Sequence, residues 1–191
     1  EMARFAEPGQ EAPFVNFLKE RFSGYAPDLV VAMGAPAFSF LARHREVLFA
    51  STPVLIAGVA EQILQAGPVI GNAALLPLEI DLKGMISDIL QVLPATGNVY
   101  VILGASPLEK FWIAEFQREL SIFSERLRIE YLDRMTYNAI RRRVAALPSD
   151  SAILYTFMIR DSAGTLLDPG EVLKMVIADS NAPVLDRKSV V

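Results

Sequence analysis

Three short turns of small residues mark the positions at which this chain could bind a small molecule. Gly34-Ala35-Pro36, Gly58-Val59-Ala60 and Gly104-Ala105-Ser106 each follow an apolar run that predicts a buried strand, and each precedes a predicted helix. Small residues let backbone N–H groups approach a ligand, and the N-terminus of a helix favours negative charge. The turns therefore predict contacts to an anionic group. The alternative for each turn is a glycine that simply ends a strand tightly.

A further pair of candidate residues lies at and just beyond the apolar run 151–157. Phe157 and Arg160 offer a ring and a guanidinium that could stack on and pair with a small organic acid; an exposed loop with Phe157 in the core is the alternative. Ser106 and Glu109 have the spacing of a capping box, which favours a helix cap over a carboxylate-binding hydroxyl. The predicted ligand-binding residues are Gly34, Ala35, Pro36, Gly58, Ala105, Ser106, Phe157 and Arg160.

No residue carries a recognisable catalytic or metal-binding signature. The glycine-rich phosphate loops, the H-E-x-x-H motif and the G-x-S-x-G nucleophile elbow are all missing from the sequence. The absence of cysteine and the single histidine exclude thiolate zinc sites, cysteine nucleophiles and multi-histidine metal centres. Paired carboxylates remain open, since a sequence does not show which side chains meet in the fold. We expect no catalytic residues, no metal and no cofactor here.

Composition narrows the class of protein further. The 191 residues are 52% hydrophobic, far too apolar for a disordered chain, and the net charge of −4 gives no general footprint for nucleic acid. A bilayer span needs roughly 20 consecutive apolar residues, and every apolar run of the chain is interrupted earlier by charge, proline or glycine. We therefore expect a compact globular chain without a nucleic-acid partner.

The elements that must position these residues alternate along the chain. Apolar runs typical of strands alternate with amphipathic stretches typical of helices, which predicts an α/β fold with parallel sheets and right-handed crossovers. The run 29–33 is wholly apolar, as in a strand buried on both faces. The predicted strands are 29–33, 53–57, 69–73, 98–103, 127–132, 151–157 and 183–185, and the predicted helices are 13–22, 36–45, 60–65, 82–93, 107–123, 137–146 and 169–180.

We predict a boundary between two lobes where Pro77 and the acidic residues Glu79 and Asp81 interrupt the apolar runs. We expect a first lobe over residues 1–78 and a second lobe over 79–191, both of ordinary domain size. In open parallel sheets, ligands bind outside the carboxyl ends of the strands. The predicted site residues of both lobes follow strands in this way.

Several short stretches occur in a characteristic order along nearly the whole chain. They are RFAEP (4–8), PDLVV (27–31), GAPA (34–37), TPVL (52–55), ILQVLP (89–94), SPLEKFW (106–112), AALP (145–148), SAILY (151–155) and NAPV (181–184). In this order they resemble the extracytoplasmic sensor domains of bacterial hybrid histidine kinases, which are themselves similar to ABC-type substrate-binding proteins.

The resemblance implies a two-lobed, periplasmic-binding-protein-like α/β domain with a hinge and a ligand cleft between the lobes. On it we expect a ligand-sensing domain of a two-component sensor histidine kinase that signals by hinge closure. The implied location is the periplasm, as part of an inner-membrane protein that meets the membrane only through its parent chain. This stretch would not itself be an enzyme, and its ligand would be an amino acid or another carboxylate.

The sequence departs from this pattern at both ends. The strand expected before Glu1 is absent, and after Val184 the return into the first lobe is replaced by Asp186-Arg187-Lys188-Ser189. An exposed sheet edge would permit a homodimer. Two alternatives stay open: a free-standing substrate-binding component of an ABC transporter, and a flavodoxin-like or nucleotide-dependent cytoplasmic enzyme.

Overall fold

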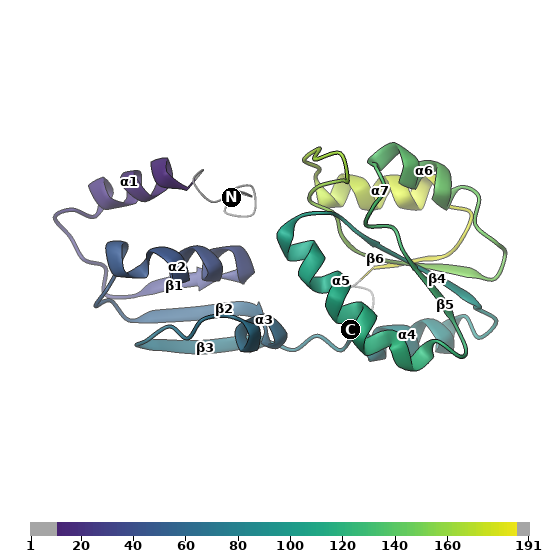
Figure 1. Ribbon diagram of the computed structural model, residues 1–191, viewed down its shortest axis with the longest axis horizontal. Helices are drawn as coiled ribbons and strands as arrows, with labels where there is room; N and C mark the ends of the chain where they lie inside the picture. The colour runs from purple at the N-terminus through teal and green to yellow at the C-terminus, as the bar shows by residue number, and fades with distance from the viewer. Residues whose placement is uncertain (1–10, 187–191) are drawn as a thin grey trace. The chain divides into compact units, whose positions relative to one another are not determined.

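The computed structural model describes residues 11–186, and the chain divides into two compact units. Unit 1 is Glu1–Ile80 and unit 2 is Asp81–Val191. Each unit has its own sheet, with strand order β1-β2-β3 in unit 1 and β5-β4-β6-β7 in unit 2 (Figure 1), and the pairings between these strands are all parallel. The predicted α/β class is confirmed. The stretch 4–8 and the residues after Asp186 lie outside the described residues.

Unit 1 begins with a helix and then alternates strands and helices. Its elements are α1 (Ala12–Arg21), β1 (Val30–Met33), α2 (Gly34–Leu48), β2 (Val54–Ala60), α3 (Glu61–Ala66) and β3 (Ala73–Leu78). The strand predicted at 69–73 lies later in the chain, at β3, because Gly71 and Asn72 form the turn before it; Asn72 has a φ of 51°. Pro77 is accommodated because β3 is an edge strand.

The core of unit 1 lies on one face of its sheet. Strands in the order β1-β2-β3, joined by right-handed crossovers, place both connecting helices on the same face. Phe38 and Leu41 of α2 pack there against Ile56 of β2, and Ile63 of α3 adds to the same cluster. Helix α1 forms a further layer on α2, where the rings of Phe14 and Phe40 lie 5.5 Å apart.

Glu11 joins the start of α1 to α2. Its carboxylate accepts hydrogen bonds from Arg43 at 2.5 Å and lies 2.6 Å from Nε2 of His44. Burial alone would raise the pKa of Glu11, but the bonds to Arg43 and His44 outweigh burial and hold this pKa below its usual range. The single histidine of the chain therefore serves as a packing and pairing group here.

The opposite face of this sheet is apolar, and no helix among residues 11–186 covers it. Val31 and Met33 of β1 and Leu76 of β3 are 51%, 73% and 62% exposed, whereas Ala32 and Ile56, which point to the other face, are buried. The expectation that the run 29–33 forms a strand buried on both faces is therefore wrong. The physical reason is the strand order, which sends α2 and α3 to one side and leaves the other without a helix. We call the set Val31, Met33, Leu55, Ala57, Ala74 and Leu76 the open face.

Unit 2 continues the alternation of helices and strands. Its elements are α4 (Leu82–Val92), β4 (Asn98–Leu103), α5 (Pro107–Leu120), the 3-10 turn η2 (Ser121–Phe123), β5 (Arg128–Tyr131), α6 (Tyr137–Val144), β6 (Ser151–Phe157), α7 (Pro169–Asp179) and β7 (Val184–Asp186). The predicted strands 98–103 and 151–157 match β4 and β6 to the residue. Both are central strands, and most of their side chains are buried.

Helices cover both faces of the sheet of unit 2. The chain moves from β4 outward to β5 and then back across to β6, so that right-handed crossovers place α5 on one face and α6 on the other. Helix α4 packs beside α5, and α7 packs beside α6 (Figure 1). This double cover explains why Ile102 and Leu154 are fully buried, in contrast to the open face of unit 1.

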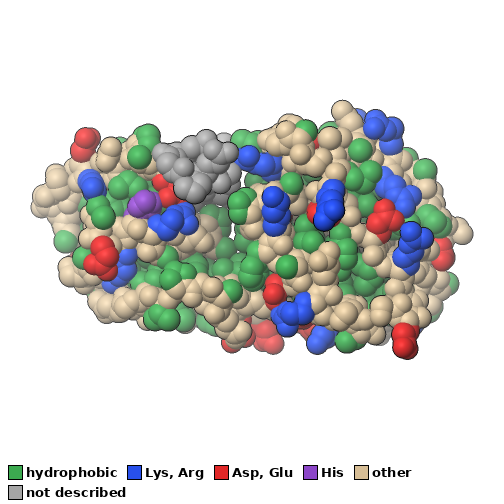
Figure 2. Space-filling view, in the orientation of Figure 1, with side chains coloured by type: hydrophobic (Ala, Val, Ile, Leu, Met, Phe, Trp, Pro, Cys, Tyr) green, Lys and Arg blue, Asp and Glu red, His purple; other side chains and the backbone are tan. Residues whose placement is uncertain are grey.

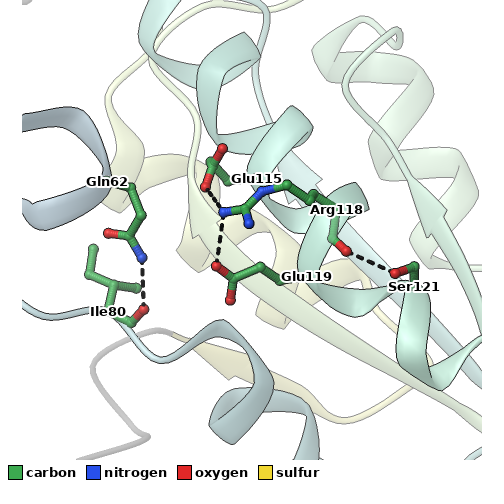
Figure 3. Close-up of polar contacts among 6 residues, drawn as sticks. All are labelled: Gln62, Ile80, Glu115, Arg118, Glu119 and Ser121. Carbon is green, nitrogen blue, oxygen red and sulfur yellow. Dashed lines mark hydrogen bonds and ion pairs between the residues drawn. The ribbon is translucent and has the colours of Figure 1, made fainter. Parts of the chain in front are cut away.

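Polar side chains hold the ends of several elements (Figure 3). In unit 1 the Gln62 amide of α3 donates to the carbonyl oxygen of Ile80 at 3.3 Å. In unit 2 Arg118 lies between Glu115 at 2.5 Å and Glu119 at 3.2 Å, and Ser121 donates to the carbonyl oxygen of Arg118. The helix predicted at 107–123 therefore ends as an α-helix at Leu120 and continues as a 3-10 turn.

Acidic and basic side chains are interspersed over the face of unit 2 that Figure 2 shows. Arg141 pairs with Asp179 at 2.6 Å, and Arg143 pairs with Glu130 at 2.9 Å while lying over the Tyr100 ring. Two arginines of the run 141–143 are thus bound to carboxylates of their own unit. Within residues 11–186, none of the helices is both long and apolar enough to cross a membrane.

Candidate ligand-binding site

The carboxyl ends of β4 and β6 bring two loops of unit 2 together. The two strands are parallel neighbours, with Leu103 paired to Phe157, so that the residues following them meet at one edge of the sheet. The backbone N–H of Ala105 donates to the carbonyl oxygen of Arg160 at 2.7 Å. The structure thus brings together the four predicted site residues of unit 2, which are Ala105, Ser106, Phe157 and Arg160.

Glu109 is the buried group that holds these loops in place. Its side chain has no exposed surface, and its Oε1 accepts hydrogen bonds from the N–H of Gly104 at 3.1 Å and of Ile159 at 2.6 Å. Its Oε2 accepts from the N–H of Ser106 at 2.8 Å, while Ser106 Oγ accepts from the N–H of Glu109 at 3.3 Å. The capping box predicted from the spacing is present, and its carboxylate also reaches the loop after β6.

Gly104 is required by the close approach of the two loops. A Cβ atom at this position would collide with the carbonyl oxygen of Arg160 and with Oε1 of Glu109. Any larger residue would force either the β6 loop or the Glu109 carboxylate to move. Gly104 therefore allows two segments of the chain to pack closely, and not a ligand to approach the backbone.

Asp161 fixes the remainder of the loop after β6. It is 4% exposed, and its Oδ1 accepts from the N–H groups of Ala163 at 3.0 Å and Thr165 at 2.9 Å. Its Oδ2 accepts from the N–H of Tyr137, the first residue of α6, at 3.0 Å. Burial would raise the pKa of Asp161, but these backbone donors outweigh burial and lower this pKa. The carboxylate therefore stays charged and holds Arg160 next to a rigid turn.

The candidate residues differ in what they leave available to a ligand. The N–H groups of Ala105 and Ser106 already have acceptors inside the unit, and the Ser106 side chain is buried in its cap. Phe157 ends β6 and is partly buried. The side chain of Arg160 is also partly buried, and its Nε atom is shielded from solvent without a hydrogen-bond partner. The Arg160 side chain thus has a buried hydrogen-bond donor that no described residue satisfies.

In unit 1 the predicted residues lie at the carboxyl ends of β1 and β2. Gly34 has a φ of 78° and opens α2 directly after β1, with Ala35 and Pro36 in the first turn. Gly58 has a φ of 64° and lies inside β2, at the register shift between Ala57 and Val59. The prediction that β2 ends at Gly58 is therefore wrong, because the strand continues through a bulge to Ala60.

Gly34 and Gly58 are needed for their backbone conformation and not to avoid a steric clash, because a Cβ at either position would have room. A Cβ at Gly58 would have no neighbour within 4 Å, and at Gly34 it would meet only Pro36 at 3.9 Å. A φ in the left-handed region favours glycine at both positions. The pairing of Met33 with Ala57 places these two turns on neighbouring strands, at the same edge of the sheet.

Arg160 is the cationic side chain among the predicted site residues, and the N–H groups of Ala105 and Ser106 are already used within unit 2. Over residues 11–186, no group of three or more histidine, aspartate or glutamate side chains is placed to hold a metal ion. Sequence reasoning missed the contact of Glu109 with Ile159 and the role of Asp161. The capping-box spacing was the available signal for Glu109, whereas a contact across fifty residues of sequence leaves no local pattern.

Comparison with known proteins adds one observation on the fold. No protein-family model and no curated protein matches the chain. Among solved structures, the chain is similar to an ABC domain from Streptococcus pneumonia in complex with L-Trp, with a TM-score of 0.59 and 16% sequence identity. The likeness covers 93% of this chain and 60% of the solved chain, so this chain spans about three fifths of the length of that domain. At this identity the likeness shows a shared fold of two parallel α/β units.

Proposed function

We propose that this chain is an extracytoplasmic ligand-sensing domain of a two-component sensor histidine kinase. In this proposal a small molecule binds between the two units, in contact with the carboxyl ends of both sheets. The observation that carries the proposal is the fold shared with an ABC domain that holds L-Trp, over 93% of this chain. The order of the short sequence stretches that resemble sensor kinases supports the signalling context.

The mechanism follows from differential contacts in two conformations. A ligand that touches the turns of Gly34 and Gly58 in unit 1 and the Arg160 loop in unit 2 binds the closed form more tightly than the open one. It shifts the population toward closure by the ratio of those two affinities. The bonds of Glu109 to both loops of unit 2 favour a rigid-body movement, because the loops move together with their sheet.

A free-standing binding component of an ABC transporter is the second candidate, favoured by the same fold likeness to an ABC domain. The two candidates share the binding step and differ in what receives the signal. Autophosphorylation of the full-length gene product with and without ligand separates them. A ligand-dependent change in phosphorylation supports the sensor, and the absence of a kinase region in the gene supports the transporter component.

Ligand binding can be tested by calorimetry, and closure of the two units by energy transfer between two dyes. We expect one member of a panel of amino acids, organic acids and sugars to bind and to raise the Tm of the purified protein. Because the chain has no cysteine, Val69→Cys and Ile177→Cys place one dye on the exposed surface of each unit without other reactive thiols. Energy transfer between these dyes should change when the ligand binds.

The matched control for closure carries both dyes in unit 2, at Glu125→Cys and Ile177→Cys. Its energy transfer should stay constant on binding, since both positions belong to one unit. A ligand that binds with no change in the first pair would contradict signalling by closure. A panel in which nothing binds would contradict the ligand-sensing function.

A further inference from the structure

Arg160 is a partly buried arginine whose side chain has no hydrogen-bond or ion-pair partner among the described residues. Within residues 11–186, three arginines are buried or partly buried: Arg45, Arg143 and Arg160. Arg45 donates to the carbonyl oxygen of Thr52 at 3.0 Å through Nη2, although its Nη1 is also buried without a partner, and Arg143 donates to Glu130 at 2.9 Å. The Arg160 side chain makes no hydrogen bond or salt bridge with any described residue, and its Nε is shielded from water.

An unpaired donor of this kind is costly to the free protein. A buried donor that loses water without gaining an acceptor costs about 1–3 kcal/mol, and more when it belongs to a charged group. The neighbouring residue, Asp161, does not relieve this cost, because both of its carboxylate oxygens are bound to backbone N–H groups. An acceptor supplied from outside the chain can reach the Arg160 guanidinium through its Nη atoms, which, unlike Nε, are not shielded from solvent.

The position of Arg160 is fixed by its backbone. Its carbonyl oxygen accepts from the N–H of Ala105, and the residue pairs with Leu166 in an antiparallel bridge. The preceding N–H, of Ile159, is bound to Glu109. The guanidinium therefore extends from a segment anchored on both sides, at the carboxyl edge of the sheet where ligands of parallel sheets bind.

The charges around Arg160 favour an acceptor with a single negative charge. One guanidinium offers one positive charge and a planar pair of donors, which matches a carboxylate. The carboxylates of Asp161 and Glu109 accept hydrogen bonds from backbone N–H groups of the same loops, and no ion pair to either of them is found among residues 11–186. These two charges repel a dianion such as phosphate more strongly than a monocarboxylate.

We propose that Arg160 is the carboxylate-binding residue of unit 2, and that the ligand of this chain is a monocarboxylate held through its guanidinium. This proposal rests on the proposed ligand-sensing function and specifies its chemistry. It assigns the anionic contact to a side chain, since the N–H groups of Ala105 and Ser106 already have acceptors.

The test is calorimetry of the purified protein with two arms of probes. The carboxylate arm contains L-tryptophan, L-leucine and pyruvate. The second arm contains L-tryptophanamide, L-leucinamide and D-ribose, which lack the carboxylate. We expect binding within the carboxylate arm only. Arg160→Gln should weaken that binding at least about tenfold, as the loss of a charge-assisted hydrogen bond predicts, and Arg160→Lys should weaken it less.

Two further measurements separate binding from folding. Arg142→Gln, on the exposed surface of α6, is the matched control and should leave the affinity unchanged. In the wild-type protein the NMR signal of the Arg160 Nε–H, assigned by its loss in Arg160→Lys, should move downfield when the carboxylate binds. This signal reports on Arg160 directly in the wild-type protein, and Arg160→Lys is used only to assign it.

The outcomes distinguish the two levels of the proposal. Equal affinity of wild type and Arg160→Gln for the bound carboxylate, or an unmoved Nε–H signal, would overturn the role of Arg160 and leave the sensing function standing. Binding in the second arm alone would overturn the carboxylate class. If nothing binds in the two arms and nothing binds in the broader panel of amino acids, organic acids and sugars, the sensing function itself is overturned.

Discussion

The backbone N–H of Ile159 donates to the carboxylate of Glu109 at 2.6 Å, across fifty residues of sequence. The same carboxylate binds the N–H groups of Gly104 and Ser106, so one buried side chain joins the turn before α5 to the loop after β6. The loop that carries Arg160 is therefore attached to the N-terminus of α5. The proposed binding by Arg160 therefore depends on Glu109, which holds the Arg160 loop in place.

Replacing Glu109 should destabilise unit 2 strongly. Glu109→Ala leaves three backbone donors without an acceptor and opens a cavity, and we expect a loss of about 3–5 kcal/mol in the free energy of unfolding. Glu109→Gln keeps one oxygen but turns an amide donor toward another N–H, at a cost of about 1–3 kcal/mol. Urea denaturation followed by circular dichroism measures both losses.

Glu171 provides the control for this change. It holds the same position in the first turn of α7, three residues after the N-cap Asp168, but its side chain is exposed and pairs with Lys174. Glu171→Gln should shift stability by no more than about 0.5 kcal/mol. Similar effects of the two Glu→Gln changes would contradict the role given to the buried carboxylate.

Gly104→Ala should disturb both stability and binding. The added methyl group would collide with the carbonyl oxygen of Arg160, a backbone atom that cannot move alone. We expect a loss of about 1–3 kcal/mol, as for other overpacked sites, together with weaker binding of any ligand held by Arg160. Gly71→Ala, where a Cβ has no neighbour within 4 Å, should be neutral or slightly stabilising. A neutral Gly104→Ala would show that the two loops separate easily.

The sequence predicted the strands of unit 2 better than those of unit 1. Strands β4 and β6 are buried on both faces and bounded by turn residues, so that their apolar runs coincide with the strands. In unit 1 the run 29–33 has the same appearance, but its exposure depends on strand order, which no local pattern records. The bulge at Gly58 was missed because a glycine after an apolar run more often ends a strand.

The candidate site was predictable in its residues and less so in its chemistry. The positions of Ala105, Ser106 and Arg160 follow from the rule that parallel strands share a carboxyl edge. The sequence did not reveal that Glu109 and Asp161 consume the backbone donors at this edge, because both act on residues distant in the chain. Because these backbone donors are already used, we now expect the Arg160 side chain, and not the N-terminus of α5, to contact an anion.

Asp161 should make stability depend on acid pH. The pKa of Asp161 is lowered in the folded protein. Its contribution to the free energy of unfolding is therefore fully present above the unfolded pKa of about 3.9 and is lost as the pH falls through the lower folded pKa. We expect Asp161→Asn to cost about 1–3 kcal/mol at neutral pH, and this difference from wild type to shrink below about pH 4.

Measurement of unfolding free energy at several pH values tests this directly. The comparison with wild type is needed because Glu11 also has a lowered pKa and loses its contribution in the same acidic range. Asp88→Asn, on the exposed face of α4, serves as the control and should follow the wild-type pH dependence. A difference between wild type and Asp161→Asn that stays constant down to pH 2 would contradict the structural role of the charge.

The open face of unit 1 should bind hydrophobic dye. Met33, Ala57 and Leu76 are aligned in register across the three strands, and Met33 and Leu76 are 73% and 62% exposed. Parallel sheets are ordinarily covered on both faces, and a contiguous exposed apolar surface attracts nonpolar molecules. The double substitution Met33→Lys with Leu76→Lys should therefore lower the fluorescence of bound anilinonaphthalene sulfonate. Because neither side chain is in the core, stability should change by no more than about 0.5 kcal/mol for each.

Val69→Lys is the control that tests whether dye binding needs the continuous open face or only a single exposed apolar residue. Val69 is 99% exposed and precedes β3 without belonging to the open face, so its replacement should leave dye fluorescence unchanged. The lysines of the double variant attract the sulfonate of the dye. A decrease in its fluorescence therefore has to come from the loss of apolar surface and not from charge. If the double lysine variant bound as much dye as wild type, the dye would lie elsewhere, and the uncovered face would not act as an apolar surface in solution.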